Sequence, residues 1–416
     1  MTPAGAGRAR EVALDDLRDH VNRGHSRIAS LLGLPLEVRS EGALVYDEED
    51  NPYLDCGGYG VFLLGHRPPD VVDAVAGQLG RHPLSTRALV EPNVASAART
   101  LISVAPAGLQ YVFFANSGTE AVELTMKLAR ANGCHRLIAA RGGFHGKTLG
   151  SLSATGNDRY RTGLEPLLPD VEFVPFGDAD ALKAALRGDP ARACVLLEPV
   201  QAEGGVRIPP EGYLRQVREL CQEFRALLAV DEIQSGLGRL GAWWGCDEEG
   251  VRPDLLTTGK VLSGGVVPVA ATLATAEVYE VLNRDPLFHS STYGGNPLAA
   301  VAAATTIEVL RRDRLIERAR GLGSRLLPQI SGALAAAGPQ LVREVRGRGL
   351  LIGIEFTSEA LAGLFLTRML RERVLTSYTL NASKVIRLTP PAILESDHID
   401  WLLRALERSA VALTGA

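Results

Sequence analysis

The segment NSGTEAVE, residues 116–123, combines a turn with the start of a helix. It follows the apolar run 111–115, which predicts a buried strand, and the residues after it have helical spacing. A helix N-terminus presents unpaired N–H groups and the positive end of the helix dipole, which suits a phosphate. Gly118 permits close backbone approach, and the hydroxyls of Ser117 and Thr119 can donate hydrogen bonds. The same residues also fit an ordinary N-cap with an acid in the first turn.

A carboxylate and a lysine follow two further apolar runs. Asp231 ends LLAVD, so its side chain is expected at the carboxyl edge of a sheet, where ligands bind in open α/β folds. A carboxylate at this edge is costly unless it meets a cation, and a protonated pyridine nitrogen is such a cation. The pairing keeps the ring protonated, and the protonated ring acts as an electron sink. Lys260 follows LLTTG, and a partly desolvated lysine beside such a ring can attack an aldehyde and later act as a general base. Taken alone, Asp231 also fits a turn cap and Lys260 a solvated loop.

The order of these motifs along the chain resembles that of enzymes that use pyridoxal 5'-phosphate (PLP). Six motifs are similar to those of the class III (omega) aminotransferases of PLP fold type I: NSGTEAVE, GGFHGKTLGSLSATG, LEPVQAEGG, VDEIQSGLGR, TTGK and HSSTYGGNPLA. The resemblance extends over nearly the whole chain, from YLDCGGYGVFLLGH to VIRLTPP. FHGKTLGSLSAT, LLPDVEFVPFGD and RVLTSYTLNASKVIRLTPP are similar to the putrescine (diamine) aminotransferase branch.

The resemblance implies cofactor-binding roles for the matching residues. It implies that Lys260 is the Schiff-base lysine and the proton carrier, and that Asp231 pairs with the ring nitrogen. It also implies that Ser117, Gly118 and Thr119 bind the phosphate, that Phe144 stacks on the ring face and that His145 lies beside the ring. Gln234 would bond to the ring 3-oxygen, and Thr292 would reach the phosphate in the neighbouring subunit.

Five residues concern the substrate. The resemblance places Glu198 and Glu203 on the substrate side and implies that Arg387 binds an α-carboxylate through a bidentate pair. A substrate without that carboxylate would leave Arg387 a buried charge, so we predict a Glu203–Arg387 switch. Lys147 stands where relatives often have an arginine that binds a second carboxylate of the substrate. Because the lysine ammonium is a point charge without the planar fork of a guanidinium, Lys147 favours substrates whose distal end is not an acid. Ala202, beside Glu203, stands where relatives usually carry glycine.

The expected activity is therefore that of a PLP-dependent omega-aminotransferase with a ping-pong mechanism. It would move an amino group between glutamate or alanine and a terminal amine or aldehyde, such as a diamine or a secondary-metabolite aldehyde. An ornithine or acetylornithine aminotransferase is the alternative within the family. A same-fold aminomutase or racemase, and a PLP-binding protein without catalysis, are alternatives outside it. If Thr292 completes a neighbour's site, the active unit is at least a homodimer.

The elements that must position these residues alternate between short apolar runs and helical patterns. RLIAA, VEFVPF, ACVLLEPV, ALLAVDE, DLLTTGK and PVAATLAT predict buried strands, which argues for an α/β fold with a mostly parallel central sheet flanked by helices. Residues 71–300 are expected to form this large PLP-binding domain. Residues 1–70, read as short strands, and residues 301–416 are expected to form a smaller α+β domain from both termini.

The composition excludes several other classes of protein. The net charge of −4, with no basic stripe, gives no sign of nucleic-acid binding. There is no run of about 18 apolar residues to cross a membrane. The first residues lack the apolar stretch of a secretory signal. The five cysteines show no metal-binding spacing and predict reduced structural thiols in a cytoplasmic protein.

Overall fold

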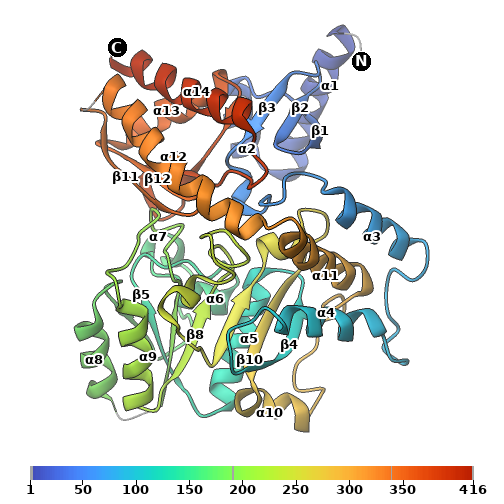
Figure 1. The fold of residues 1–416 in the computed structure, drawn as a ribbon, viewed down its shortest axis with the longest axis vertical. Coiled ribbons are helices and arrows are strands. Elements are labelled where there is room, and N and C mark those ends of the chain that lie inside the picture. The colour runs from blue at the N-terminus through green and yellow to red at the C-terminus, as the bar shows by residue number, and fades with distance from the viewer. Residues whose placement is uncertain (1–2, 190–191, 339, 415–416) are drawn as a thin grey trace.

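The centre of the protein is a sheet of seven strands in the order β4-β10-β9-β8-β7-β5-β6 (Figure 1). The structure is a computed structural model that describes residues 3–189, 192–338 and 340–414. The strands are β4 (Leu109–Ala115), β5 (Arg136–Ala140), β6 (Val171–Val174), β7 (Ala193–Leu197), β8 (Leu227–Asp231), β9 (Leu255–Thr258) and β10 (Ala270–Thr275). β10 runs antiparallel to both of its neighbours, β4 and β9, and the other pairs of neighbouring strands in this sheet are parallel. The predicted mostly parallel α/β sheet is confirmed.

Helices cover both faces of the central sheet, since every residue of β5, β7 and β8 is buried. They are α5 (Gly118–Ala131), α6 (Leu149–Ala154), α7 (Asp158–Arg161), α8 (Ala179–Gly188), α9 (Tyr213–Glu223) and α10 (Ala276–Arg284), with short helical turns η3 (Gly245–Glu249) and η4 (Lys260–Ser263). Three further helices pack together beside β4: α3 (Pro69–Leu79), α4 (Pro92–Ile102) and α11 (Pro297–Arg312).

The two ends of the chain gather at one end of the molecule, at the top of Figure 1. One sheet there has the order β1-β2-β3-β13 and the other β11-β12-β15-β14. Their strands are β1 (Glu37–Glu41), β2 (Leu44–Asp47), β3 (Pro52–Asp55), β11 (Val342–Arg348), β12 (Leu351–Phe356), β13 (Val374–Leu375), β14 (Ser377–Thr379) and β15 (Ala382–Leu388). The helices are α12 (Leu315–Ala337), α13 (Glu359–Arg371) and α14 (Ser396–Thr414). Because β3 pairs with β13, N-terminal and C-terminal segments share one sheet. The exact domain boundaries at 70 and 300 stay a prediction.

Residues 3–32 are almost entirely helical, whereas the sequence pattern indicated short strands within the first seventy residues. They form α1 (Pro3–Asp16), the π-helical turn η1 (Leu17–Val21) and α2 (Arg23–Leu32), and a further short turn, η2 (Gly58–Gly60), precedes α3. Local capping explains α2, since Asn22 caps its first turn and Gly33 ends it at φ +62°. None of the helices in the described ranges is long and apolar enough to cross a bilayer.

Candidate active site

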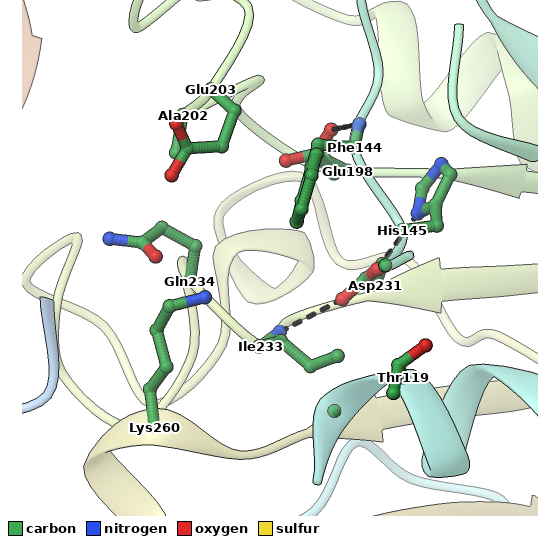
Figure 2. A pocket seen from close by; sticks show the side chains of 12 residues that line it. Thr119, Phe144, His145, Glu198, Ala202, Glu203, Asp231, Ile233, Gln234 and Lys260 are labelled. Carbon is green, nitrogen blue, oxygen red and sulfur yellow. Dashed lines mark hydrogen bonds and ion pairs between the residues drawn. The ribbon is translucent and has the colours of Figure 1, made fainter. Parts of the chain in front are cut away.

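The carboxyl ends of β4, β7, β8 and β9 meet at one edge of the central sheet. A cavity of about 230 Å³ lies at this edge, among the side chains shown in Figure 2. The predicted site residues that line it are Gly118, Thr119, Phe144, His145, Glu198, Glu203, Asp231, Gln234 and Lys260, and Gly146, Ala202 and Ile233 complete the lining. Residues from five stretches of the chain thus converge on one space, as expected at the strand ends of an α/β sheet.

At one end of the cavity, α5 begins with a reciprocal cap. The Ser117 hydroxyl accepts from the Glu120 N–H, and the Glu120 carboxylate accepts from the Ser117 N–H at 2.8 Å. The N–H groups of Gly118 and Thr119 belong to the first turn, where a helix supplies no partner for them. A Cβ at Gly118 would come within 2.8 Å of the Ile233 side chain, so a larger residue there would have to displace Ile233. This end of the cavity suits an anionic group.

Asp231 ends β8 and is held by two donors. Its Oδ2 lies 2.8 Å from Nδ1 of His145, and its Oδ1 accepts from the Ile233 N–H at 3.1 Å. Burial favours neutral His145, but the hydrogen bond and charge of Asp231 outweigh it and raise the pKa of His145. Each carboxylate oxygen can accept a further hydrogen bond, so Asp231 can still take a donor from the cavity.

Lys260 enters the cavity from the first turn of η4. Its backbone φ of +42° is rare for a residue with a side chain, and such strain gathers at functional sites. Burial lowers the pKa of Lys260; Glu203 and Asp231 oppose the shift and Arg387 adds to it. Figure 2 shows the amine rising toward the space between Gln234 and Asp231.

Gln234 is buried with both amide atoms lacking a partner among the described residues. An unpaired buried amide costs free energy unless a ligand or water satisfies it. The loop that contains η2 packs directly on it, since a Cβ at Gly60 would overlap the Gln234 Nε2 atom. Gln234 is therefore fixed in place with hydrogen-bonding capacity to spare.

Phe144 and Glu198 form another wall of the cavity. The Phe144 N–H donates to Glu198 at 3.0 Å, and in the view of Figure 2 the Phe144 ring lies above the space that Ile233 bounds below. Burial raises the pKa of Glu198 to about 8, which favours the protonated form of this carboxyl near neutral pH.

Glu203 and Arg387 form a buried ion pair beside the cavity. Oε1 of Glu203 contacts Nη1 of Arg387, while its Oε2 accepts from the Leu380 N–H at 2.8 Å. The Arg387 side chain is 1% exposed and its Nε has no partner within the described ranges. The predicted contact between the two residues is present. It joins the loop after β7 to β15 of the terminal part of the molecule.

Besides Arg387, three predicted site residues do not line this cavity. Ser117 is exposed at the N-cap, and Lys147 is exposed with its Nζ 4.4 Å from the centroid of the Tyr160 ring. Thr292 is exposed on a turn whose carbonyl accepts from Arg87. The sequence reasoning missed Ile233 as part of the lining, because nothing in its local pattern separates it from a core residue.

The chain is similar to aminotransferases. A family model described as aminotransferase class-III matches residues 33–410. The structure of the ornithine aminotransferase from Toxoplasma gondii, with PLP partly occupying its active site, is 30% identical; the alignment covers 97% of this chain and 98% of that one, with a TM-score of 0.87. The acetylornithine aminotransferase from Elizabethkingia anophelis is 30% identical, with 91% and 94% covered and a TM-score of 0.79. An engineered thermostable omega transaminase, 24% identical over 97% and 99%, shares the fold with a TM-score of 0.88.

Proposed function

Because the chain belongs to the class III aminotransferases, which are PLP-dependent enzymes, we propose that it moves amino groups between an α-amino acid and a terminal amine or aldehyde. The observation that carries the substrate class is the buried Glu203–Arg387 pair. Arg387 supplies a cation for a substrate carboxylate, and Glu203 pairs with Arg387 when the substrate has no carboxylate. Both amine types can then use one pocket. We further propose that the enzyme is cytoplasmic.

The residues of the cavity fit PLP. The unpartnered amide of Gln234 suits the ring oxygen, Asp231 suits the protonated ring nitrogen, and the first turn of α5 suits the phosphate. When bound, PLP supplies an electrophilic carbonyl carbon and a ring that withdraws electrons from the carbon bearing the substrate nitrogen. Phe144 and Ile233 would hold the ring from its two faces.

Lys260 would hold the cofactor and carry the proton. Burial lowers the pKa of Lys260 and favours the neutral amine, which is the nucleophilic and basic form. With the cofactor bound, Nζ would be the group that takes up a proton and returns it within the same cavity. Asp231, itself oriented by His145, would keep the ring nitrogen protonated throughout.

Ornithine or acetylornithine transamination is the second candidate. It is favoured by the two 30%-identical relatives, which carry those activities in their names. Lys147 weighs toward the first candidate, because its ammonium lies over Tyr160 outside the cavity lining and offers no planar fork for a distal carboxylate.

A screen of amino donors against the PLP-loaded enzyme tests the proposal. The absorbance band of the bound cofactor should be discharged by putrescine and by L-alanine or L-glutamate. Restoration of the band by pyruvate or 2-oxoglutarate separates a transaminase from a mutase or racemase, which needs no external acceptor. Discharge by ornithine or N-acetylornithine alone would favour the second candidate.

Glu203→Ala tests the proposed switch at Arg387. A substrate without a carboxylate would then leave Arg387 unpaired, so kcat/KM for putrescine should fall about 10-fold to 100-fold. The value for L-alanine should stay within about threefold, because its carboxylate replaces the lost partner. Glu211→Ala, at an exposed position, is the control. Unchanged rates with both substrates would rule out the switch.

A further inference from the structure

We propose that Asn381, at the tip of the β14–β15 hairpin, is a positioning residue that holds Glu203 against Arg387 and so sets the choice between substrates with and without an α-carboxylate. This inference rests on the proposed function. The tip consists of Leu380 and Asn381, between the end of β14 and the start of β15. Neither residue lines the cavity.

The tip grips Glu203 through two backbone donors. The Leu380 N–H donates to Oε2 of the Glu203 carboxylate at 2.8 Å, and the Asn381 N–H donates to the Glu203 carbonyl at 2.9 Å. The carboxylate therefore has one oxygen on Arg387 and the other on the tip. Since Arg387 itself lies on β15, one hairpin positions both the arginine and the residue that neutralises it.

The Asn381 side chain anchors the tip to the opposite loop. Its amide nitrogen donates to the carbonyls of Gly142 at 2.9 Å and Gly143 at 3.2 Å, just before Phe144, and its amide oxygen accepts from Asn157 at 2.9 Å. The Tyr160 hydroxyl adds a bond to the Leu380 carbonyl at 3.0 Å. All of these bonds connect segments more than 200 residues apart in the chain.

This geometry gives the tip an effect that differs between substrates. When a substrate carboxylate takes Arg387, Glu203 keeps the Leu380 N–H and is not left without a donor. When the substrate has no carboxylate, the grip keeps Glu203 aimed at Arg387. Loosening the tip should therefore harm the second case and ease the first, because Glu203 would compete less well for the guanidinium.

Asn381→Ala in the PLP-loaded enzyme tests the inference. We expect kcat/KM for putrescine to fall about tenfold and that for L-alanine to change less than about threefold. Calorimetric titration with glutarate, which has carboxylates but no reacting group, should show about threefold tighter binding. Ser383→Ala is the matched control, because this hairpin side chain bonds to Glu359 on α13 instead. In the Ser383→Ala variant, kcat/KM for putrescine and for L-alanine should equal the wild-type values.

Parallel losses with both substrates, no change with either, or a larger loss with L-alanine would overturn the inference, as would weaker glutarate binding. If Asn381→Ala does not fold, Tyr160→Phe removes the other anchor of the tip and should shift the two substrates in the same directions. A wild-type enzyme that reacts with neither substrate would defeat the proposed function instead. The glutarate titration would still test the tip, since it needs no reaction.

Discussion

Glu198 is a buried carboxyl whose pKa is shifted by its surroundings. Within the described ranges it accepts one N–H, from Phe144, and the charges of Asp231 and Glu203 lie near it. Burial raises its pKa from 4.5 to about 8, although His145 opposes the shift. As a neutral acid it can donate a hydrogen bond into the cavity, which a carboxylate cannot do.

Glu198→Gln should change the pH dependence of stability. Because the folded-state pKa lies above the ordinary value, the contribution of Glu198 to stability is fully present below about pH 4.5 and is lost as the pH rises to about 8. The wild type should therefore lose on the order of a few kcal/mol relative to Glu198→Gln between pH 5 and pH 9. Urea unfolding of the cofactor-free proteins measures this. Curves that stay parallel across the range would contradict a raised pKa.

The sequence motifs identify most residues of the cavity but not the direction of every side chain. Asp231 and Lys260 could be predicted because each directly follows an apolar run, which puts it at the edge of a sheet. Lys147 shares a motif with Phe144, yet its side chain is exposed and lies on Tyr160, a partner thirteen positions away. Contacts of this kind depend on how loops fold back, and spacing within a motif does not determine them.

At the scale of elements, the first turn of α5 has a structural role and, as we propose, a binding role, and the two can be separated. Ser117→Ala removes the cap and should lower the free energy of unfolding by about 1 kcal/mol. It should also weaken PLP binding, because the turn that offers its N–H groups to the phosphate frays. Ser358→Ala removes the comparable cap of α13, far from the cavity lining. It should cost similar stability without changing PLP affinity; equal PLP affinities in both variants would contradict a binding role for the α5 turn.

The central strands could be predicted from the sequence, but the terminal elements could not be predicted as well. β7 and β8 are apolar at nearly every position because helices cover both faces, and such runs are recognisable. β13 has only two residues and exists because β3 lies beside it. α1 shows little separation of apolar and polar faces, so its sequence does not mark it as a helix of the core. Elements that depend on distant partners carry too weak a local pattern.

At the scale of the whole molecule, exposed apolar side chains lie on the segment just after Arg87 and on the segment just before Thr292. Leu89 and Val90 are 82% and 94% exposed, and Leu287 is 86% exposed. Arg87 brings their two segments together by donating to carbonyls of the Thr292 turn. Exposed apolar patches of this kind mark association surfaces. We propose that a second copy of the chain covers this one and that Thr292 thereby reaches the partner's phosphate site.

Hybrid dimers of two defective subunits test this arrangement. Thr292→Ala should weaken PLP binding about tenfold through the loss of one charge-assisted hydrogen bond, and Lys260→Ala should be inactive. In a hybrid, the intact Lys260 of one subunit is served by the intact Thr292 of the other. Co-expressed, differently tagged subunits should therefore contain one site of wild-type PLP affinity and about half the wild-type activity at limiting PLP. If Thr292 served its own subunit, the only Lys260 of the hybrid would lie in a weakened site, and the activity would be about half that of the Thr292→Ala enzyme.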